Sequence, residues 1–299
     1  MEFRDNAKID QSRVRYGGGG AGGRRGKGLA IGGGAGGLIL VVLLMLVGPQ
    51  LGINPADLLG GDDTGGQAGQ PAGEVADAPE CRTGADIERD PECRWPAYVT
   101  SVDDFWDGQV EGYRSATTQL FRGSIQTACG TGSSHMGPFY CPGDEQIYID
   151  TDFMGDLLGM LGARGGYAAE AYIVAHEYGH HVQHLTGQMQ RARQGGDTGA
   201  GSGPVRLELQ ADCYAGVWFH HTIRDETSLI ESVSQDDLAR IVDAARAVGD
   251  DHIQQQQTGR VVEENWTHGS SAQRQKWVRT GFDTGDPIAC DTFATDDLG

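Results

Sequence analysis

The chain of 299 residues is acidic and rich in glycine, with a net charge of −19 and 48 glycines. The acidity is uneven, because seven basic and three acidic residues up to Lys27 give that stretch a net charge of +4 and leave −23 for the rest. A body with this charge repels the phosphate backbone, so we expect no nucleic acid as a partner. The length fits one folded domain with appendages.

The N-terminal part predicts a tail followed by a membrane span. Residues 1–27 are basic and glycine-rich without an apolar period, which is typical of a disordered tail. Residues 28–48 carry no charge, and the apolar run from Leu29 to Val47 would form a helix about 29 Å long, enough to cross a membrane. Basic residues precede this span and acidic ones follow it. The positive-inside rule therefore predicts a single-pass protein of the cell membrane, with a cytoplasmic N-terminus and an extracytoplasmic body.

Two weaker signals concern the span and the segment after it. The pair Gly32 and Gly36 has the spacing at which two such helices could pack, so helix-mediated self-association is a candidate property. Residues 49–94 are rich in Gly, Pro and Asp without any period, which predicts an extended tether.

All six cysteines lie beyond the predicted span, on the side expected to be oxidising. No Cys-x-x-Cys spacing supports a cysteine metal cluster, so we predict disulfides. Proximity in the sequence favours the pairs Cys81–Cys93 and Cys129–Cys141, which leaves Cys213–Cys290.

Residues 95–299 predict a mostly helical α+β domain. The capping box of Ser101 and Asp104 predicts a first helix that reaches Leu120. Short alternating runs up to residue 150 predict a small antiparallel sheet, with 146–150 either a core strand or an open edge for a peptide. Further helices are predicted from about Tyr167 to Gly187, from Pro204 to about His221, after Ser234, and from about Ser271 to just before Gly281.

The helix after Tyr167 contains His176-Glu177-x-x-His180. Residues four apart lie on one face of a helix, so both histidines can direct a ring nitrogen to one metal ion. Glu177 lies beside them, close enough to contact a water at the metal without being a ligand. This pattern predicts a zinc site of the hydrolytic kind.

A hydrolytic zinc site needs a third protein ligand. The positions that would supply a histidine in metzincins hold Gln183 and Thr186. His184 would lie about 6 Å further along the helix axis than His180, too far for one tetrahedral ion. Neither possibility supplies the ligand.

Glu208 and Asp212 are four residues apart on the next predicted helix, so both can face the metal. We predict Glu208 as the third ligand and Asp212 as the acceptor of an N–H from a ligand histidine, which would fix its tautomer. The alternative interpretation is an ordinary exposed acidic pair.

The predicted mechanism is hydrolysis by an activated water. Glu177 is the predicted general base, and it would return the proton to the leaving amine. The developing oxyanion needs a further donor, for which His268 is the predicted residue, with Tyr178, Tyr214 and His135 as alternatives.

Several motifs together resemble the neutral zinc metallopeptidase family, whose members are single-span membrane proteins with a gluzincin-type site. These motifs are Gly137–Cys141 with Pro142, the core from Ala175 to Gln183, Glu208–Cys213, Trp266–Gly269 with Ala272–Arg274, and Cys290–Phe293. The resemblance implies a zincin-like fold with Zn²⁺ held by His176, His180 and Glu208, and with Glu177 as the base. It implies a peptide or protein substrate.

Three functions are compatible with these residues. The first is a membrane-anchored zinc peptidase, acting either within chains or at an amino terminus. The second is a catalytically silent module for binding or envelope maintenance, in which zinc is a structural clip. The third is a zinc amidase acting on cell-wall peptide. The intact Glu177 favours an enzyme, because a structural zinc site needs no general base.

Overall fold

The computed structural model describes residues 1–17 and 78–299. The predicted membrane span at 28–48 lies outside these residues, together with its glycine pair and with residues 49–77 of the predicted tether. Within the described ranges, no helix combines the length and the apolar character needed to cross a membrane.

In the described part of the chain, most strands come before residue 151 and most α-helices after it. The strands are β1 (Glu2–Phe3), β2 (Val14–Tyr16), β3 (Thr117–Phe121), β4 (Ser124–Thr127), β5 (Gly130–Ser133), β6 (Phe139–Cys141), β7 (Gln146–Asp150) and β8 (Ile230–Ser232). The α-helices are α3 (Asp86–Arg89), α4 (Arg94–Asp107), α5 (Thr151–Met160), α6 (Tyr167–Leu185), α7 (Gln188–Ala192), α8 (Gly203–Thr222), α9 (Gln235–Ala247), α10 (Asp250–Thr258) and α11 (Ser271–Thr284). Short 3₁₀ helices are η1 (Gln11–Arg13), η3 (Pro91–Cys93), η4 (Ser134–Met136), η5 (Glu263–Asn265) and η6 (Pro287–Cys290).

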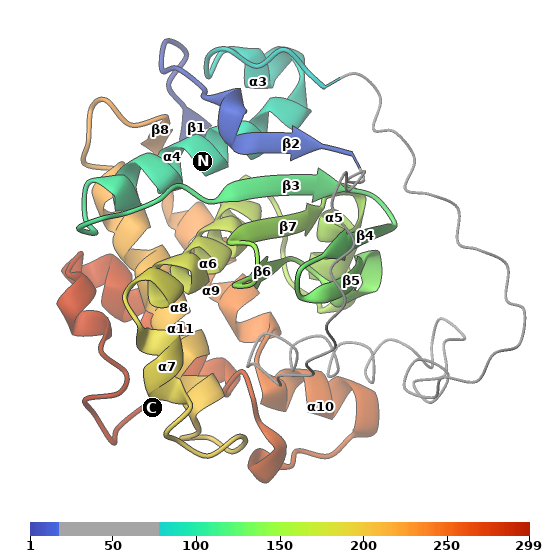
Figure 1. The fold of residues 1–299 in the computed structure, drawn as a ribbon, viewed down its shortest axis with the longest axis vertical. Helices are drawn as coiled ribbons and strands as arrows, with labels where there is room; N and C mark the ends of the chain where they lie inside the picture. The colour runs from blue at the N-terminus through green and yellow to red at the C-terminus, as the bar shows by residue number, and fades with distance from the viewer. Residues whose placement is uncertain (18–77) are drawn as a thin grey trace, which may run out of the picture.

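The main sheet has the strand order β2-β3-β7-β6, which Figure 1 shows as a stack. β2, β3 and β7 are parallel, and only β6 runs antiparallel to β7. The prediction of an antiparallel sheet is therefore wrong for the main sheet, although β4 and β5 do form an antiparallel hairpin. Alternating apolar residues indicate strands but not their direction, which the intervening hairpin and β6 determine here. β7 is paired on both sides, so 146–150 is not an open edge.

The prediction of a disordered tail over residues 1–27 is wrong for residues 1–17, which are folded. β2 pairs with β3, over 100 residues later in the chain. The guanidinium of Arg13 lies 2.9 Å from the carboxylate of Asp103, whose side chain is fully buried. The side-chain amide of Gln11 donates a hydrogen bond to the carbonyl of Pro79 (2.6 Å). These partners are distant in the sequence, so the local composition of the segment did not indicate them.

The described end of the predicted tether, residues 78–94, also belongs to the folded body. It contains α3 and η3, and the Cys81–Cys93 disulfide closes it. The other two predicted disulfides, Cys129–Cys141 and Cys213–Cys290, are formed as well, so the predicted pairing is confirmed.

The predicted bounds of two helices are wrong. α4 begins at Arg94, so Ser101 lies inside the helix rather than at its N-cap, and the segment up to Leu120 includes β3. α11 continues through Gly281 to Thr284. A Cβ atom at position 281 would lie 1.9 Å from the carbonyl oxygen of Cys213, so this glycine allows α11 to pack closely on α8 and does not end the helix.

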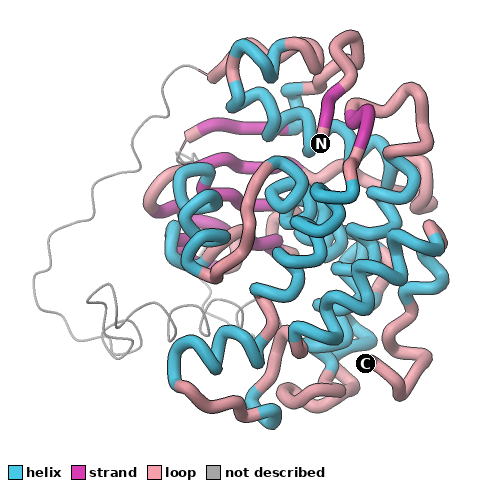
Figure 2. Tube along the Cα trace, turned by 180° about the vertical axis from the view of Figure 1, so that it is seen from behind, coloured by secondary structure: helices cyan, strands magenta, loops and turns pink. Residues whose placement is uncertain are grey.

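The helices form most of the molecule, and α8 packs against both α6 and α11. Figure 2 shows the strands of the main sheet gathered at one side, the pair β1 and β8 apart from them near the N-terminus, and helices making up most of the remainder. The main core is apolar and combines residues of α4, α6, α8, α9 and α11 with the sheet. The domain is thus α+β and mostly helical, as predicted.

Candidate metal centre

α6 and α8 approach each other closely beside the centre of the body. A Cβ atom added to Gly179 of α6 would lie 3.0 Å from the Cα atom of Ala211 of α8. Because Glu208 is one helical turn before Ala211, this contact places its carboxylate opposite His176 and His180.

The two histidines and Glu208 form a group that could hold a metal ion, and their ligand atoms all lie within 4.8 Å of one another. Nε2 of His176 is 3.2 Å from one carboxylate oxygen of Glu208, and Nε2 of His180 is 3.4 Å from the other. Ligand atoms of a tetrahedral zinc site are about 3.3 Å apart when the bonds are about 2.05 Å long. The separations therefore suit a zinc ion between the three residues.

Both imidazole rings are oriented through their other nitrogen. Nδ1 of His176 is 2.9 Å from the carboxylate of Asp212, and Nδ1 of His180 is 2.9 Å from Oε1 of Gln183. Protonation of each Nδ1 toward these acceptors leaves the Nε2 lone pairs directed at Glu208. Nε2 of His180 is buried without a hydrogen-bond partner, which is costly unless a metal ion occupies the space between the rings. The donor set fits zinc.

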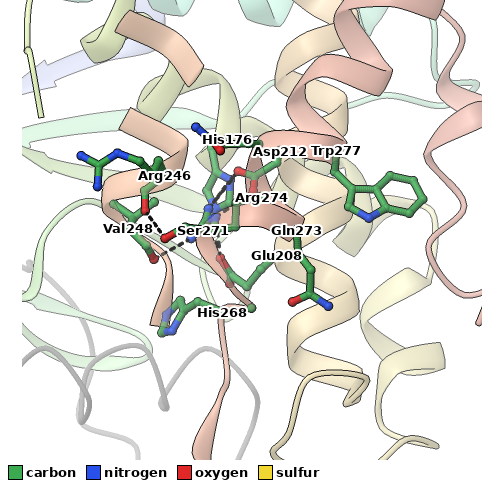
Figure 3. Close-up of polar contacts among 12 residues, drawn as sticks. His176, Glu208, Asp212, Arg246, Val248, His268, Ser271, Gln273, Arg274 and Trp277 are labelled. Atoms are coloured by element: carbon green, nitrogen blue, oxygen red, sulfur yellow. Dashed lines mark hydrogen bonds and ion pairs between the residues drawn. The ribbon is translucent and has the colours of Figure 1, made fainter. Parts of the chain in front are cut away.

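Asp212 is in turn held by Arg274 of α11, as Figure 3 shows. Nε and Nη2 of Arg274 donate to the two carboxylate oxygens of Asp212 at 2.8 and 2.9 Å. The hydroxyl of Tyr172 donates to Asp212 as well (2.5 Å). All three side chains are buried, so one carboxylate both neutralises Arg274 and positions His176.

The charges of this group shift the pKa values of its members. Burial alone would lower the pKa of His176, but its hydrogen bonds with Asp212 and Glu208 raise that pKa to about 9. Burial would raise the pKa of Glu208, but His180 and His176 hold it well below its usual range. Burial would likewise raise the pKa of Asp212, but Arg274 and His176 lower it. Both carboxylates are thus ionised at neutral pH.

Glu177 lines the cavity next to the ligands, and its Oε2 atom is buried without a hydrogen-bond partner. Burial raises the pKa of its carboxyl. A carboxylate that is desolvated and not committed to another protein group suits a general base.

His268 also lines the cavity, and it is held by Asp250. Nδ1 of His268 is 3.2 Å from the Asp250 carboxylate, which also accepts the backbone N–H groups of residues 267–269. Burial would lower the pKa of His268, but the hydrogen bond with Asp250 and the charge of Glu208 raise it. Tyr178 instead lies close to Thr118, at 3.4 Å between the hydroxyl oxygens, and Tyr214 packs on Trp106. The side chain of His135 lies outside what the structure describes.

Sequence reasoning missed three residues of this site. Gln183, Arg274 and Asp250 orient His180, Asp212 and His268 respectively. Gln183 is one turn from His180 in the same helix, a spacing that could have indicated the contact. Arg274 lies 62 residues after Asp212, and Asp250 lies 18 residues before His268, so no local pattern predicts either contact.

Zinc affinity is expected to rise with pH up to about pH 9. In the metal-free protein His176 carries a proton below this pKa, and zinc must displace it. The apparent association constant should increase about tenfold per pH unit, for one released proton. Competition with a chelator of known pH dependence measures it. Asp212→Asn removes the hydrogen bond that contributes most to the raised pKa of His176, so the zinc affinity of this variant should depend less steeply on pH. A zinc affinity of the unmodified protein that does not change with pH would contradict this prediction.

Comparisons with known proteins identify the family of the chain. The family described as "Putative neutral zinc metallopeptidase" matches residues 1–293. The uncharacterized protein Rv2575 of Mycobacterium tuberculosis is 51% identical over 255 residues, which cover 82% of this chain and 87% of that protein. The uncharacterized protein YpfJ of Escherichia coli is 40% identical over 246 residues, which cover 80% of this chain and 83% of that protein. No solved structure matches significantly. The chain belongs to the neutral zinc metallopeptidase family.

Proposed function

We propose that the protein is a zinc-dependent peptidase in which His176, His180 and Glu208 hold the metal. The observation that carries this proposal is the combination of three converging ligand atoms with the unpartnered carboxylate of Glu177 at the wall of a cavity. A structural zinc site usually completes its coordination with a fourth protein ligand. Here a cavity borders His176, Glu177 and Glu208, which supports an enzyme over a catalytically silent module. An amidase of cell-wall peptide would use the same ligands and would differ in its substrate.

The residues around the cavity can divide the work of hydrolysis among them. Zinc, when bound, lowers the pKa of water and polarises a carbonyl group. Glu177 accepts the proton of the attacking water and delivers it to the leaving amine. His268, oriented by Asp250, donates a hydrogen bond to the oxygen that gains negative charge. Asp212 and Gln183 hold the two ligand rings in the required tautomer.

Replacing the base should separate metal binding from hydrolysis. Glu177→Gln has nearly the same shape and should keep zinc bound, while peptide hydrolysis falls by about 10²–10⁴-fold. Metal analysis and a peptide assay on the two purified proteins measure this. Zinc in both with hydrolysis in the unmodified protein alone is the expected result. A chain that binds no zinc, or a variant that hydrolyses peptides at the original rate, would refute the proposal.

Replacing His268 should weaken the stabilisation of the transition state without weakening zinc binding. His268→Ala is expected to lower kcat by about 10²–10³-fold with unchanged zinc content. Asp250→Asn should give a smaller loss in kcat, because Asp250 acts through the orientation of His268. Its pH profile should shift to lower pH, since the hydrogen bond with Asp250 raises the pKa of His268. Loss of zinc from His268→Ala would show that the residue is structural.

We further propose that the body lies on an extracytoplasmic, oxidising side and that residues 1–17 lie there with it. The three disulfides support the first part. The pairing of β2 with β3 supports the second, because strands on opposite sides of a membrane cannot pair. This proposed location of residues 1–17 replaces the cytoplasmic N-terminus that the sequence led us to expect.

Cysteine labelling in intact cells tests the shared location. Arg15→Cys in β2 and Ile288→Cys in η6 each introduce one thiol at an exposed position, and the structure shows the six native cysteines paired. A maleimide that does not cross membranes should label both variants and leave the unmodified protein unlabelled. Lysed cells provide the reference for full labelling. Labelling of the Ile288→Cys protein alone would place the N-terminal segment on the other side.

A further inference from the structure

The cavity next to the proposed metal ligands is lined by two sets of residues that differ in chemistry. The polar set is that of the site and includes Glu177, Glu208, His268 and Arg274. The apolar set comes from the segment before β6, from α5 and the residue after it, and from the region of α9 and α10. Its residues include Pro138, Leu157, Met160, Leu161, Val248 and Ile253. We call this second set the apolar wall.

The volume of the cavity suits one side chain. It is about 120 Å³. An engineered apolar cavity of about 150 Å³ binds benzene, so this space can hold a group of the size of a leucine, methionine or phenylalanine side chain. Met160 is 48% exposed although it is a large apolar residue. An apolar group seated in the cavity would cover part of that surface.

Each ionisable group that lines the cavity has either a protein partner or a role in the proposed hydrolysis. Its acidic lining residues are Glu177 and Glu208, to which we assign the base and a ligand. Arg274, which also lines the cavity, is paired with Asp212 at 2.8 and 2.9 Å. His268, which also lines the cavity, is assigned to the developing oxyanion. Among the described lining residues, a free terminal ammonium or carboxylate of a substrate would therefore have to compete with these roles for a counter-charge. Burying such a charge without a partner is costly.

We infer that the enzyme cleaves bonds within a peptide chain, at a position flanked by a large apolar residue whose side chain occupies the cavity. This inference rests on the proposed peptidase function. The apolar wall supplies the selectivity, because each buried methylene group of a substrate favours binding while a charged side chain would lose its hydration there.

The test uses the full chain loaded with zinc and a set of acetylated, amidated peptides that differ at one position. Leucine, methionine and phenylalanine at this position should give values of kcat/KM about 10–100-fold above alanine, and aspartate and lysine should fall below alanine. Mass spectrometry should locate the cleaved bond beside the variable residue. Equal rates for leucine and aspartate peptides, or cleavage only of peptides with a free terminus, would overturn the inference.

Variants of the apolar wall make the test specific. Ile253→Lys on α10 and Met160→Lys at the end of α5 each introduce a cation into the apolar wall, from two different helices. Each should lower the ratio of leucine to aspartate cleavage by about tenfold or more. Ile253→Leu and Met160→Leu keep the wall apolar and should keep the ratio. Ile288→Lys, at a side chain that is 83% exposed and not part of the cavity, is the matched control for the added charge. An unchanged ratio in both lysine variants of the wall would overturn the inference.

A binding measurement separates this inference from the proposed function. The zinc-loaded Glu177→Gln protein should bind the leucine peptide about tenfold or more tighter than the aspartate peptide, as calorimetry would show. Equal affinities would overturn the assignment of the cavity. Selective binding together with no hydrolysis of any peptide by the unmodified protein would support the apolar subsite and refute the peptidase function.

Discussion

The site depends on how closely α6 and α8 can approach. Position 179 lies one residue before His180, a proposed ligand, and a Cβ atom there would come within 3.0 Å of the backbone of Ala211. A larger residue would force the helices apart and move the Glu208 carboxylate away from the two imidazole rings, to which it now lies at 3.2 and 3.4 Å. The ligand geometry is thus set by the backbone separation of two helices, which are rigid elements.

The close packing of α6 and α8 also buries several ionisable groups. The charges around each group determine whether it is paired within the protein or left to bind a metal ion. Buried carboxylates are costly unless they are paired. Asp212 satisfies this condition completely, since Arg274, Tyr172 and His176 surround it. Among the described residues, the Glu208 carboxylate has ion-pair contacts with the two histidines and with a more distant Arg274 (3.7 Å). Once His176 has lost its proton, Glu208 and Glu177 together leave negative charge at the cavity, which a divalent cation would compensate. The arrangement therefore favours metal binding without a further protein ligand.

The features that could be predicted from the sequence are those encoded within one helix. His176 and His180 share a face by their spacing, with Glu177 beside them, and Glu208 and Asp212 also share a face. That these two helices meet needed the further argument that the metal lacks a ligand. The contacts of Arg274 and Asp250 depend on how α11 and α10 pack, and the parallel strands depend on a pairing over 100 residues of chain. Gly281 is an example of a residue that the sequence alone does not assign. A glycine can end a helix or allow close contact with another helix, and here the packing of α11 on α8 requires the second role.

The N-terminal segment belongs to this same physical unit. Asp103 on α4 is fully buried, and the guanidinium of Arg13 supplies its counter-charge at 2.9 Å. Without residues 1–17, Asp103 would keep only neutral hydrogen-bond partners such as Tyr113, and β3 would be an unpaired edge. β3 pairs with β7, β7 pairs with β6, and the segment that leads into β6 contributes Pro138 to the apolar wall. Continuous strand pairing therefore connects β2 to the cavity, which places the N-terminal segment in the framework that shapes the site.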